Sequence, residues 1–106
     1  MITEQELAEL ENRYIDLQFK RLKKLNGMDR YSIAPKNPAA GGAWSLTVTK
    51  QKNGTKRREL RMADGSTRIL TADRSTWPAD VRETEEKIEE FEKQRIKNGR
   101  MYATAV

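Results

Sequence analysis

Apolar residues recur at helical spacing near the beginning of the chain. They fall three to five residues apart, at Leu7, Leu10, Tyr14, Leu17, Leu22 and Leu25. Thr3 and Glu6 have the T-x-x-E spacing of a capping box, which marks the start of a helix. Asn26-Gly27 suits the left-handed residue that commonly follows a helix. The pattern predicts a helix over residues 4–26.

A second helical pattern occupies the C-terminal third. Apolar residues follow one another at near-heptad spacing at Trp77, Val81, Ile88 and Phe91. Pro78 fits the first turn of a helix, where its missing N–H costs nothing, and Asn98-Gly99 follows the last periodic residues. The pattern predicts a helix over residues 77–98.

Between these helices, residues 44–72 read as strands. Apolar and hydroxyl residues alternate from Trp44 to Thr49. Asn53-Gly54 and Asp64-Gly65 are strong signals of tight turns. In the run 56–62, alternation places Leu60 on one face and both Arg57 and Arg61 on the other. We therefore expect a meander of two or three antiparallel strands.

Two segments remain outside these elements. Residues 28–43 contain two prolines and Gly41-Gly42, which favours a long loop, and within it Tyr31 and Ile33 are candidate anchors for a partner. Residues 99–106 read as a C-terminal tail. A mostly apolar tail is best explained if it docks on its own fold or on a neighbour, although a ragged end is an equally simple alternative. Its candidate docking residues are Arg100, Met101, Tyr102 and Val106.

These elements predict a single α+β domain over residues 1–106. Its two long helices are expected to be antiparallel and to pack with the small two- or three-stranded antiparallel meander, with an extended tail after the second helix. Hydrophobic residues make up 36% of the chain and charged residues 35%. So thin a core favours burial of apolar surface against a partner or a second copy, and a small monomer with well-solvated helices is the alternative.

The chain has no cysteine and no histidine, which excludes several kinds of metal site and catalytic mechanism. Without them the chain has no disulfide, no Cys/His zinc site, and neither a Ser-His-Asp nor a Cys-His nucleophile. No P-loop or EF-hand spacing occurs either. We expect no enzyme, no cofactor and no metal. The polar start, Met1-Ile2-Thr3-Glu4, and the lack of a long apolar run predict a protein made in the cytoplasm without membrane contact.

Charge is concentrated in the middle of the chain. The formal net charge is +5, yet residues 20–74 hold fourteen basic and four acidic residues, a net charge of +10. Such a segment favours a polyanion, most simply nucleic acid, and a solvated charged sheet is the alternative. No aromatic residues interleave the cations, so any contact should involve the backbone of duplex DNA without sequence specificity. The candidates are Lys52, Lys56, Arg57, Arg58, Arg61 and Arg68.

One family resemblance covers roughly residues 58–104. It rests on the hairpin sequence over residues 59–72, the run Ile88-Glu89-Glu90-Phe91-Glu92 and the tail around Arg100-Met101-Tyr102. This order resembles the phage lambda gpW-type head-to-tail joining family. The chain departs from that family in being longer and in carrying an insertion over residues 28–57, and its first helix matches only in position.

The resemblance implies a structural protein of a tailed-phage virion, assembled in the host cytoplasm. Copies would form a homo-oligomeric ring under the portal, around the DNA channel. The hairpin cations would face DNA or the lumen, and the tail would dock on a portal or neck subunit. Two other hypotheses follow from charge and composition: a small basic nucleic-acid-binding or regulatory protein, and a phage-encoded inhibitor or adaptor that binds one protein target.

Overall fold

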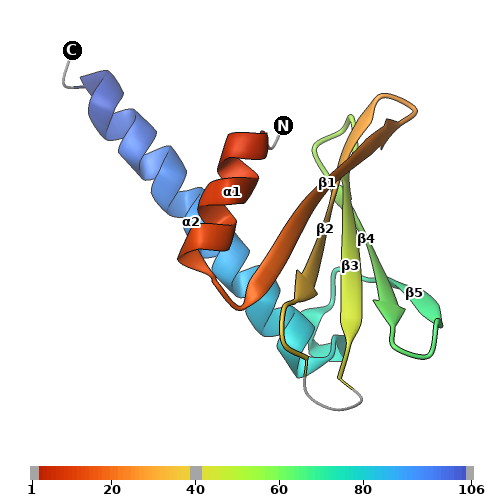
Figure 1. Ribbon diagram of the computed structural model, residues 1–106. Coiled ribbons are helices and arrows are strands. Elements are labelled where there is room, and N and C mark those ends of the chain that lie inside the picture. The colour runs from red at the N-terminus through yellow and green to blue at the C-terminus, as the bar shows by residue number, and fades with distance from the viewer. Residues whose placement is uncertain (1–2, 39–41, 105–106) are drawn as a thin grey trace. The chain divides into compact units, whose positions relative to one another are not determined.

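The computed structural model describes residues 3–38 and 42–104, with side chains as far as Gln94 in the last helix. The chain divides into two compact units, Met1–Thr76 and Trp77–Val106. The first contains helix α1 (Glu4–Arg13), a five-stranded sheet and a short 3₁₀ helix, η1 (Arg74–Thr76). The second contains helix α2 (Ala79–Thr104). Figure 1 labels these elements.

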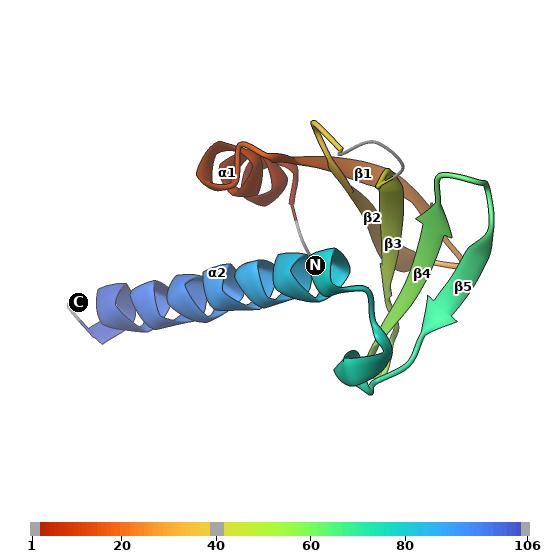
Figure 2. The ribbon, with the colours of Figure 1, turned by 90° about the horizontal axis from the view of Figure 1, so that it is seen from below.

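The sheet is an antiparallel meander in which each strand pairs with the next along the chain. Its strands are β1 (Leu17–Leu25), β2 (Met28–Pro35), β3 (Trp44–Lys50), β4 (Lys56–Met62) and β5 (Thr67–Leu70), and their order in space is β1-β2-β3-β4-β5. Strands β1 and β5 therefore form the two edges (Figure 2). The predicted fold class, two long antiparallel helices on a two- or three-stranded meander, is wrong.

Helix α1 begins where the sequence predicts and ends much earlier. The hydroxyl of Thr3 accepts a hydrogen bond from the amide of Glu6 at 3.2 Å, which satisfies one of the free donors in the first turn. At the other end, Tyr14 leaves helical geometry, and its amide makes the last bond to the Leu10 carbonyl at 2.8 Å. The prediction of a helix over residues 4–26 is therefore correct for its first ten residues only.

Strand β1 begins four residues after α1 ends. Leu17 and Phe19 are buried, whereas Gln18 and Lys20, which follow them, are exposed, and this is the period-two pattern of a strand. Ile15, which falls within the helix predicted over residues 4–26, is 76% exposed. The Glu11 carboxylate accepts a hydrogen bond from the Phe19 amide at 2.9 Å and so ties α1 to β1.

The turn at Asn26-Gly27 explains the error. Both residues have positive φ, 54° and 76°, and Leu25 pairs with Met28 across the turn. This is the two-residue type I′ geometry that Asn-Gly favours between strands. The predicted loop over residues 28–43 is wrong in its first half for the same reason, because residues 28–35 form β2, the partner of β1.

Of the two or three strands expected in residues 44–72, three are present, β3, β4 and β5. Their two turns share one geometry, in which the Gly54 and Gly65 amides donate to the Gln51 and Met62 carbonyls, each at 3.0 Å. In each turn an Asx side chain accepts the amide two residues later: Asn53 from Thr55 at 3.1 Å and Asp64 from Ser66 at 2.8 Å. These Asx turns fix the register of both hairpins.

One face of the sheet carries the core of the first unit. Cross-strand partners on this face include Phe19, Ile33, Leu46 and Leu60, which lie on one row across four strands. Together with α1, the sheet contributes the buried apolar side chains of Leu7, Leu10, Leu17, Phe19, Tyr31, Ile33, Trp44, Leu46, Val48, Leu60 and Leu70. No side chain on the opposite, outer face is buried among the described residues of the strands.

In the second unit, α2 spans most of the predicted helix and continues to Thr104, so residues 99–104 are helical where an extended tail was expected. The helix begins at Ala79, so Pro78 lies just before its first residue and not within its first turn as predicted. Val81, Thr84, Ile88 and Phe91 are buried and fall on one face of the helix. The side chains of Arg100, Met101 and Tyr102, and the whole of Val106, lie outside the described residues.

Candidate nucleic-acid interface

The meander brings two separate segments of the chain to one end of the sheet. Because consecutive strands are antiparallel, the β1–β2 and β3–β4 turns lie at the same end, the upper end of the sheet in Figure 1. We define the basic end as residues 21–31 and 48–58, the halves of four strands that flank these turns. The loop end is the other half of the sheet, residues 14–20, 32–36, 44–47 and 59–68.

Most charged residues of the basic end are cations. It contains nine cations and a single carboxylate, Asp29, for a net charge of +8. The cations are Arg21, Lys23, Lys24, Arg30, Lys50, Lys52, Lys56, Arg57 and Arg58. So dense a group of like charges raises the free energy of the folded state through repulsion and attracts a polyanion from solution.

Strand register places these cations in rows across the sheet. On the outer face, Arg30 and Arg57 lie on one row, separated only by Thr49 of β3. On the core face, the row nearest the turns pairs Asp29 with Lys50, and Lys50 with Lys56. Hence the basic end presents charge from both faces, and from the β3–β4 turn through Lys52.

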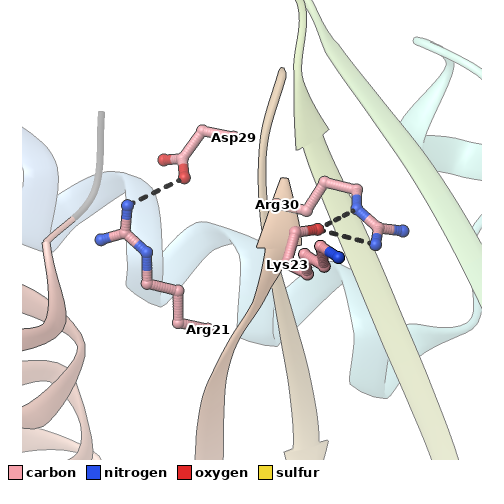
Figure 3. Close-up of polar contacts among 4 residues, drawn as sticks. All are labelled: Arg21, Lys23, Asp29 and Arg30. Carbon is pink, nitrogen blue, oxygen red and sulfur yellow. Dashed lines mark hydrogen bonds and ion pairs between the residues drawn. The ribbon is translucent and has the colours of Figure 1, made fainter. Parts of the chain in front are cut away.

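Two arginines of the basic end are held by neighbouring groups (Figure 3). Arg21 forms an ion pair with Asp29, with 3.4 Å between Nη2 and Oδ1, and the Asp29 side chain is only 8% exposed. Arg30 donates from Nε and Nη2 to the main-chain carbonyl of Lys23, at 3.0 and 2.8 Å. This carbonyl lies beside the register shift between Leu22 and Leu25, so the guanidinium braces the irregular part of the β1–β2 hairpin.

The loop end carries nearly balanced charge. Its four cations and three carboxylates give a net charge of +1. Asp64 in the β4–β5 turn accepts hydrogen bonds from the hydroxyl and the amide of Ser66, and these donors lower the pKa of its carboxyl. Arg68 donates to the Thr76 carbonyl at 3.3 Å. Nothing at this end resembles the cation cluster of the other.

The remaining polar surface of the sheet is hydroxyl-rich. Ser45, Thr47 and Thr49 of β3 follow one another along the outer face, none of them buried. The three aromatic side chains of the strands, Phe19, Tyr31 and Trp44, are each less than 9% exposed and belong to the core face. Within the described sheet there is accordingly no aromatic platform on which unpaired bases could stack.

The structure separates the candidates named from the sequence. Lys52, Lys56, Arg57 and Arg58 lie in the basic end, whereas Arg61 and Arg68 lie in the loop end. Arg57 and Arg61 are exposed on the face opposite Leu60, as predicted, and Arg58 lies on the Leu60 face. Tyr31 and Ile33 are fully buried in the sheet core, so neither presents a docking surface.

Sequence reasoning missed the half of the site that β1 and β2 supply. Arg21, Lys23 and Lys24 fall within the helix predicted over residues 4–26, and Arg30 falls within the predicted loop over residues 28–43. The signal that could have found them is Asn26-Gly27, flanked on both sides by segments able to form strands.

No group of three or more potential metal ligands occurs in the described part of the chain. Among the described helices, none is long and apolar enough to cross a membrane. Comparison of the chain with protein-family models, curated proteins and solved structures finds no match.

Proposed function

We propose that the basic end binds the phosphate backbone of duplex nucleic acid without sequence specificity. The observation that carries the proposal is the convergence of nine cations and one carboxylate at one end of a single sheet. Lys and Arg side chains displace condensed counterions from the phosphates, and this release supplies most of non-specific affinity. The cost of keeping these charges together is offset when a polyanion neutralises them.

Geometry favours a duplex over a single strand. Four neighbouring strands contribute to the basic end, and at roughly 4.8 Å between strands their width is about 14 Å. A surface of that width can contact phosphates of both strands of a duplex, on the two sides of a groove. The aromatic side chains of the strands are buried, which removes the stacking contacts typical of single-strand binding.

The test compares two triple variants that remove the same charge from opposite ends. One is Lys24→Gln, Lys52→Gln and Arg57→Gln in the basic end, and the other is Lys20→Gln, Lys36→Gln and Arg61→Gln in the loop end. All six side chains are exposed, so both variants should fold. Affinity for a short random-sequence duplex is measured by fluorescence anisotropy over a range of salt concentrations, with thermal unfolding as a check on the fold.

We expect the basic-end triple to weaken binding several hundredfold at about 0.1 M salt, and to reduce the slope of log affinity against log salt by about 3. The loop-end triple should lose less than about tenfold. Equal losses in the two variants would mean that net charge alone governs binding, and no measurable duplex binding by the natural chain would refute the proposal.

The head-to-tail connector predicted from the family resemblance stays a prediction. Its expected architecture of two long helices around a small meander is wrong. No other feature of the described residues supports ring assembly or portal contact. Basic-end binding to duplex requires no ring.

A further inference from the structure

The tip of the β1–β2 hairpin is apolar where its surroundings are charged. Leu25 and Met28 pair across the Asn26-Gly27 turn, and Leu25 is 53% exposed. Arg30 and Met28 are two residues apart on β2, so the apolar pair lies on the outer face together with the Arg30 row. The tip thus presents an apolar side chain at the extremity of the basic end.

Cations surround this apolar tip. Lys23 and Lys24, both exposed, immediately precede Leu25, and Arg30 lies on the facing strand. Two features hold the tip in place. The type I′ turn joins the strands with only two residues, and the Arg30 guanidinium donates two hydrogen bonds to the Lys23 carbonyl. The neighbouring cations can attract a polyanion, and the rigid hairpin then holds the apolar side chain against it.

We propose that the β1–β2 hairpin tip enters the minor groove of the duplex and that Leu25 wedges between adjacent base pairs, unstacking them and kinking the helix. This inference rests on the proposed function, since it requires duplex at the basic end. Minor-groove proteins commonly insert an aliphatic side chain in this way, while neighbouring cations contact the phosphates on either side. Lys23 and Lys24 are placed to make those contacts.

The tip fits a base step better than a lipid surface. It offers a single strongly exposed aliphatic side chain, whereas interfacial membrane binding depends on a broad apolar face. A gap between two base pairs requires only one wedge, and unstacking gives that side chain an apolar environment it lacks in water.

The experiment uses the full chain and a 20-base-pair duplex labelled at its two ends for energy transfer, with 2-aminopurine at internal steps. Leu25→Ala removes the wedge, and Leu25→Met retains an apolar side chain of similar length. Ile69→Ala is the matched control, because Ile69 is 49% exposed but lies on β5, away from the tip. Anionic vesicles of phosphatidylserine and phosphatidylcholine are titrated in parallel.

We expect the natural chain, Leu25→Met and Ile69→Ala to shorten the end-to-end distance and to raise 2-aminopurine fluorescence. Leu25→Ala should change the affinity less than about fivefold and leave the salt slope unchanged, because it removes no charge, yet it should lose both signals. Binding by the natural chain without bending or unstacking would overturn the wedge and leave the proposed function intact.

Failure to bind duplex at all would remove both proposals. Tight vesicle binding that Leu25→Ala abolishes, with bending unaffected, would assign the tip to a lipid surface and overturn the wedge.

Discussion

The two ends of the sheet are built alike and charged differently. At each end a tight turn contains an Asx-Gly pair with glycine at positive φ, and four strands run continuously from one end to the other. Yet the basic end has a net charge of +8 and the loop end +1. Folding requirements are therefore similar at both ends, and the charge difference needs another cause.

The charge difference separates what the fold requires from what is available for binding. A hairpin turn needs its glycine and its Asx side chain, and Arg21 and Arg30 also hold neighbouring groups of the fold, but neither the turns nor the ladder needs so many further cations beside one carboxylate. Charges that cost stability and satisfy no folding requirement are the best candidates for contact with a partner. Three changes test this separation, ordered by the size of the expected effect on stability.

Asp29→Asn should lower stability and strengthen duplex binding together. The substitution is isosteric, but it removes the negative charge that pairs with Arg21, which is the sole carboxylate of the basic end, so we expect a loss of about 1–2 kcal/mol in urea denaturation. Duplex affinity should rise because one opposing charge disappears. Glu59→Gln at the loop end is the control, with little change in either quantity, because Glu59 is exposed. Weaker duplex binding by folded Asp29→Asn protein would contradict the assignment.

Gly27→Ala and Gly65→Ala should cost similar amounts of stability, about 1 kcal/mol each. Their φ angles are +76° and +88°, and an added Cβ would meet nothing within 4 Å at either site, so the cost arises from the backbone alone. Chemical denaturation measures both. A much larger loss at one turn would show that the two ends are not built alike.

The two Asx turns should differ in their response to acid. Hydrogen bonds from Ser66 lower the pKa of Asp64, so this carboxylate stabilises the fold fully above its unfolded pKa and loses that contribution as pH falls below about 4. Asn53 makes the equivalent bond to Thr55 with an uncharged amide. The stability difference between the natural chain and Asp64→Ala should shrink in acid, whereas that for Asn53→Ala should not. Thermal unfolding between pH 7 and pH 3 measures both small effects, and parallel curves would contradict this origin.

Sequence reasoning succeeded where turn signals lay between unambiguous strands. The run from Trp44 to Leu70 alternates cleanly around two Asx-Gly turns, so its three strands and two turns are confirmed. In residues 14–25, Leu17 fits both a helical stripe and a strand face, and local periodicity cannot decide between them. Pairing with β2 decides for the strand, and β2 was hidden because Pro35 and the following glycines favoured a loop.

The sequence identified the cations of the candidate site only in those strands that it also predicted. Lys52, Lys56, Arg57 and Arg58 were found because their turn was recognised. The cations of β1 and β2 join them only through the β2–β3 pairing, in which Arg30 lies opposite Thr49 and Asp29 opposite Lys50. Such proximity between distant residues depends on topology, and the sequence pattern of neither segment contains it.

The bond from the Phe19 amide to the Glu11 carboxylate has a consequence for self-association. Strand β1 is an edge strand, and an outward-pointing amide there is a template on which a strand from another molecule can add. Glu11 occupies that donor, and its negative charge faces any approaching backbone carbonyl. The helix that precedes the sheet thus serves as a guard against aggregation at one edge, independently of what the basic end binds.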